Sequence, residues 1–433
     1  TNAKAFLASN GLNCLDIDME HPGWTNATAP DANSMIEAGR FNELLKKLKG
    51  TFAGAYELSI AATGSFWFAQ FHYPFLAAWS ESLDHVNLMT YDLSGTWDSF
   101  TGHNAPIYSA NITPIGVTSP SGFYNFMRDA SFTNGWGELV RANAATDNRG
   151  RFPNFPLNVD TIVRELSILG VPHHKMVLGA PFYGRAFKGV PAGNNGQFQS
   201  HTTEGGDPYS GDASWLLGCQ PCVNRKEPRF VTYSEITGML AANVGYQKFF
   251  NNQALVPYLY HPAKQVYVTY DDPQSIKYKG AYIVEQGLAG GMFWHLGQDT
   301  TDGQMLGALH SVLNGNPNEA NQFSTRQVAG IKYNPWMPAN IEPFSAQKTY
   351  GYNAVVVDAN DNVWRAESPT AGVSPNGNTG WKLLGVKHDN GIKYHPAQIA
   401  KFAQGDMNGM NVVLDSGPNP GPNPGPNPGP NPG

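Results

Sequence analysis

Hydrophobic and polar positions follow two alternating patterns over about the first 310 residues of the chain. Short apolar runs, typical of buried strands, are separated by longer stretches in which apolar residues recur with helical spacing. Such alternation predicts an α/β fold with a parallel sheet. The predicted strands cover residues 12–20, 57–62, 85–91, 175–181 and 290–296, and the predicted helices cover residues 38–48, 71–80, 159–169 and 273–285.

The number of strands indicates an incomplete barrel. A closed (β/α)8 TIM barrel needs eight parallel strands, and the pattern yields about five. We therefore expect a barrel domain over residues 1–315 that lacks about its first three βα units and is truncated on the N-terminal side. Residues 188–272 interrupt the alternation with a stretch rich in Gly, Asn and aromatic residues. Two strand-like runs within it, 229–235 and 264–270, predict an α+β insertion domain.

The pattern changes again beyond the barrel. Isolated aromatic residues and short β runs, such as 354–357, are set among turn signals and predict a small all-β module over residues 326–415. Residues 416–433 repeat Gly-Pro-Asn-Pro, a composition that has no apolar content to fold. We expect this last segment to be an extended linker or tail.

Composition and charge narrow the class of protein. Charged residues make up 14% of the chain, below the usual quarter, while aromatic residues reach 12%. These proportions suit a secreted protein that meets carbohydrate. The net charge of −6, without a basic stripe, argues against nucleic acid as a partner. No window approaches the roughly 20 apolar residues that a membrane helix needs.

The three cysteines are Cys14, Cys219 and Cys222. The Cys219–Cys222 spacing is compatible with half of a metal site or with a local disulfide. Because no second cysteine pair or histidine cluster completes a zinc site, we expect neither a metal nor another cofactor.

The strand predicted at residues 12–20 carries an unusual set of acids. Alternation places Asp16, Asp18 and Glu20 on one face and the apolar residues between them on the other. Carboxylates this close repel one another and lose hydration, which a strand selected for stability alone would avoid. Crowding separates their pKa values, so that one of them can stay protonated as a general acid. Glu20 lies nearest the carboxyl end of the strand, where barrel enzymes bind substrate.

This acidic strand resembles the signature Asp-Gly-x-Asp-x-Asp-x-Glu of glycoside hydrolase family 18, the chitinase family. The three acids match the last three acids of the signature. Asn13 and Cys14 stand where the family has its first Asp and its Gly, and Met19 replaces the usual Trp. The resemblance covers about residues 1–312, because further segments match the family's strands and loops in the same order. These segments are residues 87–92, 95–97, 102–106, 175–185 and 290–294.

The resemblance implies a TIM barrel that hydrolyses β-1,4-linked N-acetylglucosamine with retention, assisted by the substrate's own acetamido group. In that mechanism Glu20 donates the proton and later acts as base. Asp18 orients the acetamido group, Asp16 supports Asp18, and Tyr91 holds the acetamido oxygen. The implied partner is chitin or a chito-oligosaccharide, and we expect the protein to be a monomer.

The resemblance also implies residues that contact the sugars. A single Trp or Tyr on a barrel strand is more often part of the core than a sugar contact. The prediction of sugar contacts therefore rests on several such residues occurring together within the matched segments. These residues are Met89, Asp92, Trp97, Tyr183, Arg185 and Trp294.

The C-terminal module resembles the small chitin- or cellulose-binding modules attached to chitinases. Its expected chitin-binding residues are Tyr352, Trp364 and Trp381. The alternative is a small β domain in which these tryptophans form the domain's own core.

Two other functions compete with a chitinase. One is a chitinase-like lectin, which typically lacks the proton donor that Glu20 supplies here. The other is an endo-β-N-acetylglucosaminidase acting on glycoproteins, which shares the Asp-x-Glu centre. The insertion domain and the segment around Trp97 favour chitin over the second alternative.

Overall fold

A computed structural model of the chain describes eighteen stretches of residues, on which all structural statements below rest. These stretches are residues 2–23, 32–64, 75–98, 100–108, 110, 158–168, 171–203, 215–219, 230–314, 317–326, 328, 342–350, 355–359, 362–366, 370–375, 380–388, 391–393 and 403–404. Tyr352, Cys222 and the predicted tail at 416–433 lie outside them.

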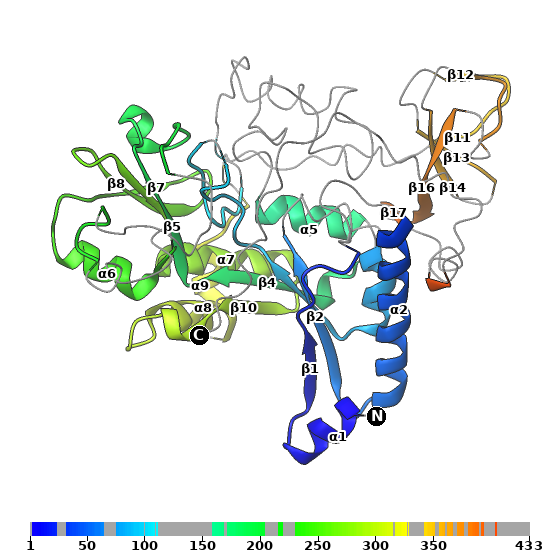
Figure 1. Cartoon of the computed structure of the whole chain (residues 1–433), viewed down its shortest axis with the longest axis horizontal. Coiled ribbons are helices and arrows are strands. Elements are labelled where there is room, and N and C mark those ends of the chain that lie inside the picture. The colour runs from blue at the N-terminus through cyan, green and yellow to red at the C-terminus, as the bar shows by residue number, and fades with distance from the viewer. Residues whose placement is uncertain are drawn as a thin grey trace.

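A five-stranded sheet in which every neighbouring pair is parallel forms the centre of the barrel domain (Figure 1). Its strands, in spatial order, are β1 (Cys14–Ile17), β2 (Glu57–Thr63), β3 (His85–Met89), β4 (Met176–Pro181) and β10 (Gly290–Trp294). Strands β1 and β10 form the two edges, so the described strands make up a curled half-barrel. The predicted α/β class and the predicted number of barrel strands are confirmed.

Helices alternate with the parallel strands along the chain, beginning with one that precedes β1. Their bounds are α1 (Asn2–Ser9), α2 (Ala32–Phe52), α5 (Val159–Ile168), α7 (Pro273–Gln286), α8 (Gln304–Asn314) and α9 (Pro317–Gln322), and residues 75–82 are also helical. Short 3-10 turns occur at η2 (His173–Lys175), η3 (Gly193–Gly196) and η5 (Leu296–Gln298). Helix α2 extends beyond the predicted 38–48 because its apolar stripe continues to Phe52, which is fully buried.

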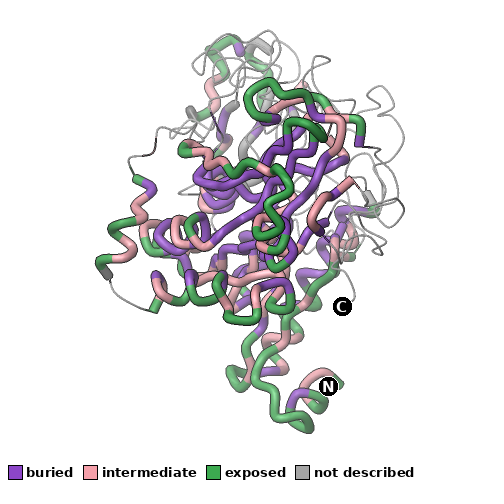
Figure 2. Tube along the Cα trace, turned by 90° about the vertical axis from the view of Figure 1, so that its left-hand side faces the viewer, coloured by how far each residue is buried: buried purple, intermediate pink, exposed green. Residues whose placement is uncertain are grey.

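The main core lies between the sheet and these helices. Leu58, Ile60, Val86 and Leu88 are buried at alternate positions of β2 and β3, as the two-residue period of a strand requires. In Figure 2 the buried segments lie mainly in the interior of the trace, whereas the N-terminal end of the chain is largely exposed.

A second sheet, antiparallel and with strand order β6-β5-β9-β8-β7, constitutes the insertion. Its elements are β5 (Tyr183–Lys188), β6 (Phe230–Thr232), α6 (Tyr233–Ala241), β7 (Gln247–Asn251), β8 (Val256–His261) and β9 (Val266–Thr269). Strand β5 begins one residue after β4 ends, so the two sheets are joined at Phe182.

The strand predicted at 229–235 is wrong beyond Thr232, where α6 begins. The Thr232 hydroxyl accepts a hydrogen bond from the backbone of Glu235, and the Glu235 carboxylate accepts one from the backbone of Thr232. This capping box satisfies backbone donors at the helix start and therefore favours the helix over a longer strand.

The C-terminal module is built from short strands in its described residues, as expected for an all-β unit. These strands are β11 (Glu342–Pro343), β12 (Thr349–Tyr350), β13 (Val355–Val357), β14 (Asn362–Ala366), β15 (Thr370–Ala371), β16 (Trp381–His388) and β17 (Gly391–Lys393). Trp364 and Trp381 pack with Tyr350 and Val356 in its core and are 6% and 2% exposed. Their prediction as chitin-binding residues is wrong, because a buried ring cannot lie flat against a polysaccharide surface.

Three observations bear on the cysteine, metal and membrane predictions. Cys219 is disulfide-bonded, whereas Cys14 is a free, exposed thiol. Among the described side chains, no group of three or more His, Cys, Asp or Glu is arranged to hold a metal ion. A search of the described helices likewise finds none with the length and apolar character that crossing a membrane requires.

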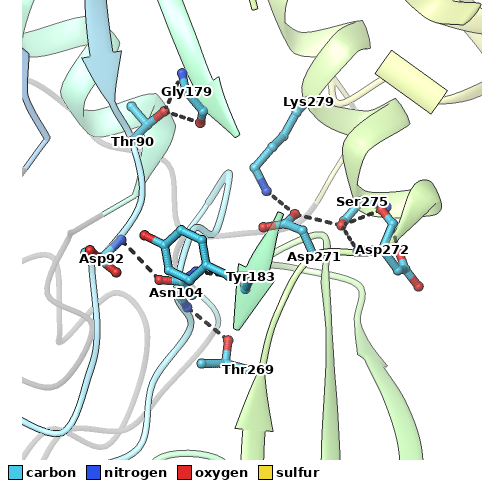
Figure 3. Close-up of polar contacts among 10 residues, drawn as sticks. All are labelled: Thr90, Asp92, Asn104, Gly179, Tyr183, Thr269, Asp271, Asp272, Ser275 and Lys279. Atoms are coloured by element: carbon cyan, nitrogen blue, oxygen red, sulfur yellow. Dashed lines mark hydrogen bonds and ion pairs between the residues drawn. The ribbon is translucent and has the colours of Figure 1, made fainter. Parts of the chain in front are cut away.

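A buried ion pair anchors helix α7 to the end of β9. Asp272 caps the helix by accepting a hydrogen bond from the Ser275 backbone at 2.9 Å, and the Ser275 hydroxyl donates to Asp271 Oδ1 at 2.7 Å (Figure 3). The ammonium of Lys279 pairs with the carboxylate of Asp271, and both side chains are fully buried. Burial lowers the pKa of Lys279 and raises the pKa of Asp271, so each charge depends on the other.

Replacing Lys279 by Met should therefore destabilise the protein strongly. The substitution leaves Asp271 as an uncompensated buried charge, which costs about 3–5 kcal/mol in the free energy of unfolding. The matched control is Lys277→Met on the same helix, where the lost ion pair with Glu319 is partly exposed and its loss should cost much less. Urea denaturation measures both, and equal losses would contradict the assigned role of the buried pair.

Candidate active site

The acidic segment begins inside β1 and continues beyond it. The ladder between β1 and β2 ends at Ile17, so Asp16 lies in the strand while Asp18 and Glu20 follow its carboxyl end. Leu15 and Ile17 pack against the core and Asp16 faces the other side, which confirms the alternation within β1. The predicted strand over 12–20 is too long, because inter-strand hydrogen bonds no longer fix the alternation beyond Ile17.

Asp16 is held by neutral donors on the next two strands. Its Oδ1 atom accepts hydrogen bonds from the Ser59 hydroxyl on β2 and from Asn87 Nδ2 on β3, the latter at 2.9 Å. Ser59 is the register partner of Asp16 across the parallel ladder. Hydrogen bonds of this kind stabilise a carboxylate and fix its orientation.

Ser59 and Asn87 were not among the predicted site residues, although the pattern contained a signal for both. Each is a half-buried polar residue between buried aliphatic neighbours on a predicted strand. Each therefore points to the same side of the sheet as Asp16. Only the pairing of the strands shows that the three side chains meet.

Glu20 has the environment of a general acid. Its side chain is 15% exposed. Burial raises the pKa of Glu20 from its ordinary 4.5 to about 8, and the charge of Asp18, a hydrogen bond with Asp18 and the charge of Asp92 act in the same direction. A carboxyl group with this pKa carries its proton at neutral pH and can donate it.

His21 lies beside the same carboxyl group. Its Nε2 atom is 3.7 Å from Glu20 Oε2, and its side chain is 2% exposed. Burial lowers the pKa of His21 to about 4, so the imidazole is neutral near pH 7. It therefore adds no positive charge that would favour ionisation of Glu20. The sequence analysis did not identify His21 as a site residue.

Tyr91 follows β3 and reaches the acidic segment from the neighbouring part of the sheet. Its ring fits because residue 179 is glycine: a Cβ atom there would lie 2.9 Å from Tyr91 Cε1 and 2.3 Å from a backbone oxygen of β3. Burial raises the pKa of Tyr91 well above its usual range, and the charges of Asp92, Glu20, Asp18 and Asp16 add to the effect. The hydroxyl group therefore stays protonated and can donate a hydrogen bond.

Asp92 connects the barrel to the second sheet. Its Oδ1 atom accepts hydrogen bonds from Arg185 Nε at 2.9 Å and Arg185 Nη2 at 2.7 Å. Arg185 lies on β5 and is only 5% exposed, so this is an almost buried ion pair. Asp92 has a φ of +56°, in the left-handed region that non-glycine residues rarely adopt.

Three aromatic rings surround the guanidinium group of Arg185. The Arg185 Cζ atom lies 5.3 Å from the ring centroids of Trp97 and Tyr183 and 5.4 Å from that of Phe230, within the range of cation–π attraction. Trp97 can fold back here because residue 95 is glycine, where a Cβ atom would meet the indole ring at 2.3 Å. Tyr183 is 2% exposed. The cation therefore orients Trp97 as well as Asp92, while direct sugar contacts by Tyr183 and Arg185 stay a prediction.

Met89 and Trp294 complete the predicted set. They are the last residues of β3 and β10 and both are half-buried. The carbonyl oxygen of Trp294 accepts a hydrogen bond from the Phe182 backbone at 2.8 Å, which ties β10 to the junction between the two sheets. The predicted barrel residues thus gather at or just beyond the carboxyl ends of the strands, where parallel barrels carry their active sites.

Grouped carboxylates at the ends of parallel barrel strands, one of them protonated at neutral pH and accompanied by half-buried aromatic side chains, define a glycosidase site. The sequence model of Glycosyl hydrolases family 18 matches residues 1–299. The chain belongs to this family.

Individual relatives agree with this assignment. The chain is 38% identical over 391 residues to Chitinase B of Serratia marcescens, covering 88% of this chain and 74% of that protein. It is 30% identical to Chitinase A1 of Niallia circulans, covering 69% of this chain and 36% of that protein. The structure of the second catalytic domain of the Ostrinia furnacalis Group II chitinase superimposes with a TM-score of 0.52 at 25% identity, covering 73% of this chain and 70% of that one.

The raised pKa of Glu20 predicts that this residue destabilises the fold in alkaline solution. In the unfolded chain the carboxyl group ionises near 4.5, but the folded protein holds it protonated up to about pH 8. The folded state is therefore penalised as pH rises between these values. Glu20→Gln removes the penalty and should be more stable than the parent by roughly 2–4 kcal/mol at pH 8, with a gap that closes near pH 4.

Urea denaturation from pH 4 to pH 9 measures this gap. Glu43→Gln is the matched control, because Glu43 lies on the exposed surface of α2 and pairs only loosely with Lys46. A gap for Glu20→Gln that is independent of pH would contradict a pKa near 8.

Proposed function

We propose that this protein is a chitinase that hydrolyses β-1,4 linkages between N-acetylglucosamine units of chitin and chito-oligosaccharides. The observation that carries the proposal is Glu20, whose pKa of about 8 keeps a proton available beside Asp18 at the carboxyl end of β1. The family assignment and the names of the curated relatives support the substrate class.

The proposed reaction has two steps and uses the substrate's acetamido group as nucleophile. In the first, Glu20 gives its proton to the glycosidic oxygen while the acetamido carbonyl oxygen attacks the anomeric carbon. The glycosidic bond breaks, and an oxazolinium intermediate remains. In the second, the Glu20 carboxylate takes a proton from water while the water oxygen adds to the anomeric carbon. The bond between that carbon and the acetamido oxygen breaks, which restores the neutral acetamide and leaves Glu20 protonated.

Asp18 and Asp16 have separate parts in this proposal. Asp18 accepts a hydrogen bond from the acetamido N–H, which orients the nucleophile and stabilises positive charge on the oxazolinium ring. Asp16, fixed by Ser59 and Asn87, supports Asp18 from the strand behind it. The Tyr91 hydroxyl donates a hydrogen bond to the acetamido oxygen. Because the pKa of Tyr91 is raised, this hydroxyl stays protonated at any pH where Glu20 is active.

The remaining residues hold the sugars. Trp294 offers an aromatic face beneath the sugar that becomes distorted, and Trp97 offers one on the leaving-group side. Met89 forms an apolar wall, and Asp92 with Arg185 forms the polar end of the pocket. We further expect the protein to act as a secreted monomer.

Hydrolysis of a chromogenic chitobioside tests the proposal directly. Glu20→Gln should lose about 10³-fold in kcat, because a missing general acid typically costs 10²–10⁴-fold. The control Glu43→Gln should match the parent. The value of kcat/KM should fall as pH rises through about 8, where the free enzyme loses the Glu20 proton. Binding of chito-oligosaccharides without any turnover would support a lectin, and release of N-glycans would support an endo-β-N-acetylglucosaminidase.

The acetamido group of the substrate provides a separate test of the two-step reaction. A chito-oligosaccharide whose cleaved unit carries an amine in place of the acetamide has no internal nucleophile and should be essentially inert. A thiazoline analogue of the intermediate should inhibit hydrolysis competitively, since it reproduces the oxazolinium ring. Equal turnover of the acetylated and deacetylated substrates, measured by product chromatography, would refute substrate assistance while leaving the glycosidase assignment intact.

A further inference from the structure

Asn104 lies in the loop that follows β3 and belongs to a matched segment, 102–106, to which no function has yet been assigned. Its side chain is fully buried. Every hydrogen bond described for it goes either to the loop that carries Asp92 or to the second sheet. This placement makes Asn104 a physical link between two parts of the site.

On one side, Asn104 holds the backbone around Asp92. Its Oδ1 atom accepts a hydrogen bond from the Asp92 backbone N–H at 3.1 Å (Figure 3). Its carbonyl oxygen accepts one from the Leu93 backbone N–H at 2.9 Å. Asp92 has the left-handed φ of +56°, which costs energy and persists only when its surroundings hold it. The two hydrogen bonds provide that restraint.

On the other side, Asn104 is fastened to the second sheet. Its Nδ2 atom donates to the carbonyl oxygen of Tyr183 on β5 at 3.2 Å. Its backbone N–H donates to the Thr269 hydroxyl on β9 at 2.9 Å (Figure 3). Asn104 therefore transmits the position of the antiparallel sheet to the backbone of Asp92.

The position of Asp92 matters because its carboxylate faces two different groups. Arg185 binds the Asp92 carboxylate through two nitrogen atoms. The negative charge of Asp92 also helps to raise the pKa of Glu20. Asn104 contacts neither Arg185 nor the acidic segment in the hydrogen bonds described. The direct route from Asn104 to the acid centre therefore runs through Asp92, and a second route runs through Tyr183, whose ring centroid lies 6.1 Å from that of Tyr91.

We propose that Asn104 is a positioning residue that fixes the Asp92 carboxylate between Arg185 and Glu20 and couples the second sheet to the acid centre. Its effect on turnover rests on the proposed function, whereas its effect on the protonation of Glu20 does not.

The variant that tests this role is Asn104→Ala, and the matched control is Thr101→Val in the same loop. Thr101 is also fully buried and also bonds to the insertion, donating to the Gly196 carbonyl oxygen at 2.6 Å and accepting from the Gln199 backbone at 3.0 Å. It makes no described hydrogen bond to Asp92. Both variants remove a buried polar contact, so both should lower stability, but only the first should alter the acid centre.

In Asn104→Ala we expect kcat on a chitobioside to fall by about 10–100-fold, the cost of a misplaced active-site group, with a smaller change in KM. The alkaline limb of the kcat/KM profile should move to lower pH by about half a unit, because a displaced Asp92 no longer favours the protonated form of Glu20. Thr101→Val should keep the parent's kcat and pH profile. Should Asn104→Ala fail to fold, Asn104→Ser, which is too short to reach the Asp92 N–H, takes its place with the same expectations.

A double-mutant cycle with Asp92→Asn separates positioning from a general loss of structure. If Asn104 acts through the Asp92 carboxylate, Asn104→Ala should cost little further activity once that charge is gone. The proposal would be overturned if the activity losses of Asn104→Ala and Asp92→Asn were additive in the double mutant. It would also be overturned if Asn104→Ala, like Thr101→Val, kept the parent's pH profile of kcat/KM.

Titration of Glu20 itself distinguishes failure of this inference from failure of the proposed function. The difference infrared spectrum between the parent and Glu20→Gln reports the carboxyl group of Glu20 without any substrate. Asn104→Ala should lower that titration midpoint, and Thr101→Val should not. A parent with no chitinase activity but with this shift would refute the proposed function and support the positioning role, and an unshifted midpoint would refute the positioning role whatever the activity.

Discussion

The proton on Glu20 is the feature on which the rest of the site depends. Three carboxyl groups follow one another along β1 and the segment beyond it, and a fourth, Asp92, faces them from the next part of the sheet. Burial and neighbouring negative charge favour the neutral form of Glu20 at a cost to the stability of the fold. The surrounding residues hold this arrangement in place: Ser59 and Asn87 bind Asp16, and Arg185 binds Asp92.

The second sheet supports the acid centre as well as extending the barrel. Strand β5 follows β4 almost without a break and brings Arg185 to Asp92, while Asn104 connects β5 and β9 to the backbone of Asp92. A displacement of this sheet would move the Asp92 carboxylate and the aromatic ring of Trp97 together, since both contact Arg185. The proposed sugar-binding ring and the carboxylate that influences Glu20 therefore share one guanidinium group as a contact.

Much of the architecture could be predicted from the pattern of residues. Buried parallel strands read as short apolar runs, so the five strands of the described parallel sheet were all located, and the acids at 16, 18 and 20 stood out because carboxylates are costly on a strand. The errors occurred where local pattern does not decide the outcome. The strand at 12–20 ends early because its ladder partner stops pairing, and Thr232 begins a helix because a capping box forms there. Trp364 and Trp381 show the same limit, since an aromatic residue in a small β module has the same sequence signature in the core and on the surface.

The sequence by itself determined the class of fold, the family and the identity of the acids, because these depend on residue type and on spacing along one chain. Tertiary structure decided which groups control those acids. Ser59, Asn87, His21 and Asn104 are ordinary polar residues, and they belong to the site only through strand pairing and loop contacts across 12 to 165 positions in the chain or through burial beside Glu20. The pKa of Glu20 is likewise a property of the folded site, since burial is its largest cause and no residue is buried until the chain has folded.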